Sequence, residues 1–149
     1  MAPFCRKATL LLHILVSVGW MGAVATFLVL ALNGFYIAME AVTTWLIVPL
    51  AFLSLITGVV QALATPRGLF RHYWILYKFL INLASLPILL LHTRIIHRVA
   101  VAARMNQLSG FREDRAQLVA ASVAALIALF VALLLSVFKP KGVTAYGRR

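Results

Sequence analysis

Long apolar runs separated by short polar segments dominate the sequence. Four of the runs contain about twenty residues or more, the length that an α-helix needs to cross the hydrocarbon core of a bilayer. We expect these helices at about 8–32, 41–64, 73–93 and 116–138. The runs lack the short alternation of apolar and polar residues that is typical of membrane barrel strands. The pattern predicts an all-α, polytopic membrane protein.

The connections between the expected helices are short. Residues 33–34 (Asn-Gly) end the first helix, and residues 65–68 (Thr-Pro-Arg-Gly) turn between the second and the third. Residues 94–105 have the pattern of an amphipathic helix that extends the third. A break follows at residues 109–110 (Ser-Gly), and the fourth helix is expected to start near Arg112, ahead of its apolar run. Because short connections make successive helices antiparallel neighbours, we expect the whole chain to form a single domain, an antiparallel four-helix transmembrane bundle.

Composition agrees with this class of protein. Hydrophobic residues make up 64% of the chain and charged residues 11%, whereas soluble domains have about 45–50% and about 25%. The net charge is +11, and the basic residues lie beside the apolar runs, so the expected partners are the bilayer and its anionic headgroups rather than nucleic acid. A single cysteine, Cys5, excludes an internal disulfide and a cysteine metal site.

The distribution of positive charge predicts the orientation. Nine Lys and Arg fall on the side of the two termini, namely Arg6, Lys7, Arg67, Arg71, Lys78, Lys139, Lys141, Arg148 and Arg149. The opposite side has five, namely Arg94, Arg98, Arg104, Arg112 and Arg115. Since positive residues favour the cytoplasmic side, we expect both termini in the cytoplasm.

Polar side chains inside apolar helices are costly, and each one is therefore a candidate functional residue. The candidates are His13, Trp20, Glu40, Gln61, Lys78, Asn82 and His92. Lys78, Asn82, Ser85 and His92 follow at relative positions 0, 4, 7 and 14, which places them along one face of the third helix.

Depth along the bundle separates these candidates into two expected clusters. Four residues, His13, Thr57, Gln61 and Lys78, all lie a few residues from the side of the termini. His92 lies fourteen residues beyond Lys78, or about 21 Å at 1.5 Å per residue, and is expected at the level of Glu40.

The residue types favour cofactor binding over hydrolysis, because the spans contain no paired carboxylates and no nucleophile beside a base. A neutral imidazole in a helical bundle is a common axial ligand of haem iron, which makes His13 and His92 the candidate metal ligands. Trp20 could cover a porphyrin face, and Arg67, Arg71 and Lys78 could pair with its propionates. In the alternative interpretation, His13, Gln61, Lys78 and Asn82 form a proton or ion relay or only join the helices.

Several stretches resemble an uncharacterised family of small four-helix bacterial membrane proteins, over nearly the whole chain. The stretches include HILVSVGWMG (13–22), LITGVVQ (55–61), TPRGLFRHYW (65–74) and SVFKPKGVTAYG (136–147). This resemblance implies a multi-pass protein of a bacterial plasma membrane.

The layout is more distantly similar to that of HemJ-type protoporphyrinogen oxidases, and its first helix also resembles copper-resistance membrane domains. The shared positions are His13, Trp20, Gly22, Met39, Glu40, Pro49, Gly58, Trp74, Lys78, His92, Lys139 and Pro140. The resemblance implies an oxidoreductase that binds haem b, in which His13 and Lys78 are functional. The HemJ pattern has an Arg and a further His later in its first helix, and residues 24–33 contain neither, so haem binding is better supported than porphyrinogen oxidation.

The leading hypothesis is a membrane-embedded redox protein that binds haem b or another porphyrin, with His13 as axial ligand. Lys78 would hold a propionate or transfer protons, and His92 with Glu40 would form a second ligand site or a proton exit. The hypothesis leaves the electron partner open. The alternative is a non-catalytic subunit or a small transporter-like bundle. The Ala-rich fourth helix has a surface that suits a homodimer.

Overall fold

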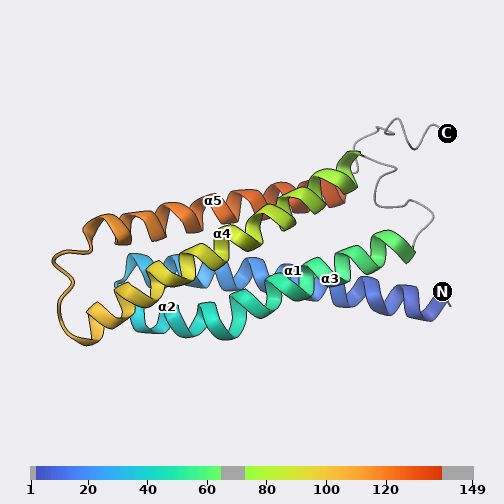
Figure 1. Cartoon of the computed structure of the whole chain (residues 1–149). Helices are drawn as coiled ribbons and strands as arrows, with labels where there is room; N and C mark the ends of the chain where they lie inside the picture. The colour runs from blue at the N-terminus through green and yellow to red at the C-terminus, as the bar shows by residue number, and fades with distance from the viewer. Residues whose placement is uncertain (1–2, 65–72, 139–149) are drawn as a thin grey trace.

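The computed structural model describes residues 3–64 and 73–138 of the chain, and these residues form an antiparallel bundle of helices (Figure 1). The elements are α1 (Pro3–Leu32), α2 (Tyr36–Val42), the π-helical segment η1 (Thr43–Ile47), α3 (Val48–Ala64), α4 (Tyr73–Arg104) and α5 (Arg112–Phe138). No strand occurs within the described ranges. The predicted all-α four-helix bundle is confirmed.

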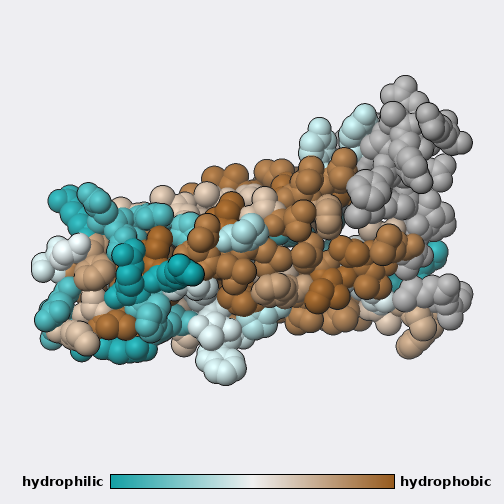
Figure 2. Space-filling view, in the orientation of Figure 1, coloured by the Kyte–Doolittle hydropathy of each residue, from teal (hydrophilic) through white to brown (hydrophobic). Residues whose placement is uncertain are grey.

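Four helices are long and apolar enough to cross a membrane: Phe4–Leu32, Tyr36–Leu63, Tyr73–Arg104 and Arg112–Phe138. In Figure 2, hydrophobic residues cover most of the visible surface, and hydrophilic residues gather at one end of the bundle. A surface of this kind is suited to contact with lipid tails. The chain is therefore a multi-pass membrane protein.

Two of the helices begin earlier than expected, and the fourth begins at the predicted residue. α1 begins at Pro3, because proline is well suited to the first position of a helix and the residues up to Ala8 include no helix breaker. The second span begins at Tyr36 rather than near residue 41. α5 begins at Arg112, where Glu113 and Asp114 in its first turn interact favourably with the helix dipole.

α1 and α4 end in the same backbone motif. Gly34 has a φ of 78°, and the Phe35 N–H donates to the Leu30 carbonyl at 2.9 Å. After α4, Asn106 has a φ of 56°, and the Gln107 N–H donates to the Ala102 carbonyl at 2.9 Å. These bonds define Schellman caps. The extension of α4 thus ends at Arg104, with Asn106 in its cap, and residues 109–110 lie in the following connection.

The second span is interrupted by η1, which the sequence analysis did not predict. The Val48 N–H donates to the Thr43 carbonyl, five residues back, instead of to the residue four back. Pro49 follows directly and has no N–H to donate, so the regular hydrogen-bond ladder cannot continue through this point. The π turn replaces the regular bond with one to the carbonyl five residues back, and the helix continues as α3.

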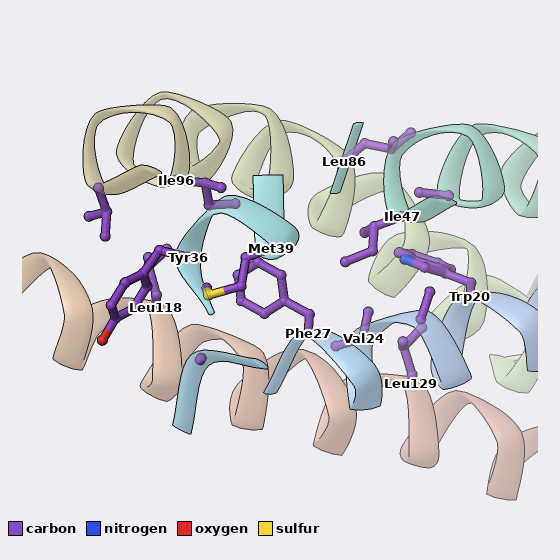
Figure 3. Packing of buried hydrophobic residues seen from close by; sticks show 14 residues of the cluster. Trp20, Val24, Phe27, Tyr36, Met39, Ile47, Leu86, Ile96, Leu118 and Leu129 are labelled. Atoms are coloured by element: carbon purple, nitrogen blue, oxygen red, sulfur yellow. The ribbon is translucent and has the colours of Figure 1, made fainter. Parts of the chain in front are cut away.

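The two ends of the bundle differ in packing. We call residues 31–47 and 94–119, where α1 meets α2 and α4 meets α5, the connection end. We call residues 4–17, 54–63, 73–85 and 133–138, at the opposite end, the terminal end (Figure 1). The connection end buries large side chains such as Tyr36, Met39, Ile96 and Leu118, several of which are drawn in Figure 3.

At the terminal end, burial is confined to small or polar side chains. Among its described residues, the buried ones are Val16, Ser54, Thr57 and Ala62. Residues 73–85 of α4 contain no buried side chain. The hydrophobic core therefore lies in the middle and at the connection end, and the predicted functional residues His13 and Lys78 lie beyond it.

Candidate functional site

His13 lies at the terminal end, in the contact between α1 and α3. Its Nδ1 is 2.9 Å from the hydroxyl oxygen of Thr57. The Thr57 hydroxyl donates its proton to the Leu53 carbonyl at 2.7 Å, which leaves its oxygen as an acceptor for the ring. This network assigns the proton of a neutral imidazole to Nδ1, so the lone pair resides on Nε2.

Gly58 permits the close approach of α3 to the His13 ring. A Cβ atom on Gly58 would lie 3.2 Å from Cε1 of His13, closer than an ordinary contact. One turn deeper, the hydroxyl groups of Ser17 and Ser54 are 3.0 Å apart, and they also join α1 to α3. These contacts form a short column of polar side chains between the two helices.

Lys78 extends this site from α4. The side chain is half-buried, and its charge is near enough to His13 for the two groups to interact electrostatically. The Lys78 Nζ also lies 5.9 Å from the centre of the Trp74 ring, a cation–π contact. The predicted grouping of His13 with Lys78 at one level is confirmed, and Thr57 from α3 is part of the same site.

Two further candidates of this group, Gln61 on α3 and Asn82 on α4, are half-buried. Arg67 and Arg71, the predicted propionate partners, lie outside the described residues.

Trp20 does not line a space beside His13. Its side chain is 4% exposed and belongs to the hydrophobic cluster that also contains Ile47 and Leu129 (Figure 3). Its indole Nε1 is buried and has no hydrogen-bond partner among the described residues. The prediction that Trp20 covers a porphyrin face is thus not supported by its position, because its ring packs into the core.

The expected pairing of His92 with Glu40 is wrong. His97, not His92, contacts Glu40, with 2.5 Å between Nδ1 and Oε1, and Arg104 donates to the other carboxylate oxygen at 2.6 Å. The ring of His92 bonds instead to the Ile88 carbonyl of its own helix at 2.8 Å. The error arises from one helix boundary: the second span starts at Tyr36, five residues earlier than expected, so Glu40 lies inside it and faces the extension of α4 that the sequence predicted.

The connection end contains further polar contacts that the sequence analysis missed. Arg115 donates from Nε to the Tyr36 hydroxyl at 2.6 Å, and its guanidinium lies 5.4 Å from the centre of that ring. Arg98 approaches Asp114 at 3.4 Å. The sequence signal for this cluster is that all three acidic residues, Glu40, Glu113 and Asp114, lie next to helix ends at this side of the bundle.

His13 and His92 cannot ligate the same iron. His92 lies fourteen residues along α4 from Lys78, about 21 Å, whereas His13 is at the level of Lys78. Within the described part of the chain, no three His, Cys, Asp or Glu residues gather in a way that could hold a metal ion. Among the described residues, His13 is therefore the one imidazole that a ligand at the terminal end could use.

We found no match to this chain among protein-family models, curated proteins or solved structures. The fold and the site define the class: a multi-pass four-helix membrane protein in which His13, half-buried within a span, is bonded to a threonine and accompanied by a lysine.

Proposed function

We propose that this protein is a membrane-embedded redox protein that binds haem b, or another porphyrin, through Nε2 of His13. The observation that carries the proposal is the chain of hydrogen bonds from His13 Nδ1 to the Thr57 hydroxyl, 2.9 Å, and from there to the Leu53 carbonyl, 2.7 Å. Histidines that ligate metals commonly donate their second ring N–H to a fixed acceptor, which sets the tautomer and the ring orientation. His13 has this arrangement.

The surrounding residues fit a porphyrin ligated from one side. Charge on an imidazole would be costly in hydrocarbon and next to the Lys78 ammonium, so His13 is suited to act as a neutral ligand. Lys78 supplies a positive charge for a propionate at the same level. The terminal end buries few large side chains, so it retains apolar surface that a flat, apolar ring could cover.

Haem would supply one-electron chemistry, and the chain's own residues would position it. Thr57 orients the imidazole, Gly58 lets the two helices approach at the ring, and Lys78 compensates carboxylate charge. His92 has no part in ligation, because it lies at a different depth from His13.

The test is the visible spectrum of the detergent-purified protein, oxidised and then reduced with dithionite. We expect a Soret band, with α and β bands that sharpen on reduction. His13→Ala should abolish the bound chromophore, and His92→Ala, a matched histidine on another helix, should retain it. A flat spectrum after haem is supplied during expression, or equal spectra for both variants, contradicts the proposal.

A second candidate function is a non-catalytic subunit or a small transporter-like bundle. It is favoured by the column of bonds from His13 to Thr57 and from Ser17 to Ser54, which joins α1 and α3 without any ligand. In this case His13→Ala would lower only the stability of the bundle, and no chromophore would be lost.

A further inference from the structure

A cavity of about 550 Å³ opens at the connection end, between the end of α1, the start of α2 and the start of α5. Its lining divides into two chemical parts. Ala31, Leu32 and Val119 provide apolar surface, whereas Arg112 and Arg115 provide positive charge. A site with adjoining apolar and cationic parts is suited to an anionic amphiphile.

We propose that this cavity binds the phosphate headgroup of an anionic phospholipid, whose acyl chains lie on the neighbouring apolar surface of the bundle. The proposal is independent of haem binding, because none of its residues belongs to the His13 site. It assigns a defined binding site to a headgroup, beyond the general attraction of a basic protein to anionic membranes.

The charges at this end favour an anion in the cavity. Glu40 is paired with His97 and Arg104, and Asp114 is paired with Arg98. The third carboxylate of the chain, that of Glu113, has no ion pair within the described residues. No side-chain carboxylate therefore neutralises Arg112 or Arg115, and both remain available to a negatively charged group.

Arg115 is held in a fixed position before any ligand arrives. Its Nε donates to the Tyr36 hydroxyl at 2.6 Å, and the guanidinium lies 5.4 Å from the centre of the tyrosine ring. The two terminal nitrogens keep donors for phosphate oxygens, which guanidinium groups bind in bidentate geometry. Because these contacts with Tyr36 already order the long side chain of Arg115, a ligand loses less binding free energy to the ordering of that side chain.

The location favours a lipid over a soluble phosphate. The cavity lies where four transmembrane helices end or begin, the level at which headgroups meet basic side chains. Leu32 lines the cavity and is 66% exposed, so apolar surface continues from the site onto the membrane-facing side of α1. A soluble phosphate would gain nothing from this surface.

The experiment measures phospholipid retained by the full-length protein in native mass spectrometry, after titration of the detergent-purified protein. We expect one phosphatidylglycerol to bind at least about tenfold more tightly than phosphatidylcholine with the same acyl chains. The double substitution Arg112→Gln with Arg115→Gln should remove this preference. Arg94→Gln, a substitution of an exposed arginine of α4 that does not line the cavity, should leave it unchanged.

A second variant keeps the charges and fills the space. Ala116→Phe, at an exposed position of the lining, should lower phosphatidylglycerol retention as much as the double substitution does, with unchanged helical content by circular dichroism. Three results would overturn the proposal: equal retention of the two lipids, equal losses for Arg94→Gln and for the double variant, or displacement of the lipid by glycerol phosphate at equal concentration. The last result would assign the site to a soluble phosphate.

Discussion

The connection end and the terminal end of the bundle are stabilised by different kinds of interaction. At the connection end, Glu40 contacts both His97 and Arg104, and Met39 is fully buried at 0% exposure. At the terminal end, α1 and α3 are joined by neutral hydrogen bonds of His13 and Ser17, and the described residues there form no ion pair. The charged contacts of Glu40 and Asp114 lie near the ends of the spans, whereas the hydrogen bonds of His13 and Ser17 lie within a span, where ion pairs are costlier.

The two ends therefore differ in role: the connection end provides stability, and the terminal end provides the candidate binding site. Large buried side chains and charged contacts at the connection end hold the helices together regardless of any ligand. The terminal end has few large buried side chains, so a ligand there could add contacts without displacing an existing core. Substitutions at the two ends should therefore have different consequences, and the following predictions run from the largest expected effect to the smallest.

Met39→Ala should cause the largest loss of stability. Met39 has no exposed surface, so its truncation leaves a cavity that costs about 2–5 kcal/mol. The measurement is the midpoint of denaturation in mixed micelles, followed by circular dichroism. Leu80→Ala, at a position 48% exposed at the terminal end, is the control and should change the midpoint little. Similar shifts for both variants would show that the two ends do not differ in packing.

Glu40→Gln should destabilise the connection end by about 1–2 kcal/mol, because it weakens the contacts of one carboxylate with both His97 and Arg104. The two partners are 64% and 50% exposed, which keeps the effect moderate. Glu113→Gln removes a carboxylate that makes no ion pair among the described residues, so it loses only the interaction with the α5 dipole and should cost about 0.5 kcal/mol or less. If Glu40→Gln cost no more than this control, the contacts with His97 and Arg104 would contribute nothing to stability.

The Glu40 cluster also shows how far the sequence could predict this structure. Length and hydropathy were sufficient for the four spans, because about twenty apolar residues have few alternatives to a membrane helix. Length and hydropathy were insufficient to identify the partner of Glu40, because that partner depends on the residue at which the second span begins. A shift of five residues along α4, about 7.5 Å, exchanges His92 for His97.

At the candidate site, the sequence predicted the level of His13 and Lys78, since helix direction and residue count determine depth. It could not predict the η1 segment or the burial of Trp20 in the core. Pro49 indicates that the hydrogen-bond ladder is interrupted, but not whether the helix widens, kinks or ends there. The burial of Trp20 depends on how side chains of different helices fit together, which hydropathy along one helix does not contain.

Gly58→Ala tests the close approach at His13. The new Cβ would lie 3.2 Å from Cε1 of the ring, so α1 and α3 must separate slightly, at a cost of about 1 kcal/mol. Gly22→Ala is the matched control on α1, because no atom lies within 4 Å of its added Cβ, and alanine should be neutral or stabilising there. Should both alanines be tolerated equally, the packing of Gly58 against the imidazole would not constrain the site.

Thr57→Val should have the smallest effect on stability and a specific effect on the site. It removes the acceptor of His13 Nδ1 while retaining the shape of the side chain, and interhelical hydrogen bonds in membranes contribute only about 0.6 kcal/mol. Thr26→Val removes a hydroxyl that bonds only within α1, to the Gly22 carbonyl at 3.0 Å, and serves as the control.

The two threonine variants become informative when spectra are compared with stability. If His13 ligates haem, the loss of the Thr57 acceptor makes the imidazole a weaker donor to iron, so the reduction potential should rise in Thr57→Val and stay constant in Thr26→Val. If the polar column serves only to join α1 and α3, both variants should change the denaturation midpoint slightly and show no chromophore. A bound haem whose potential is the same in both variants would place the iron on another ligand, because Thr57, unlike Thr26, is bonded to His13.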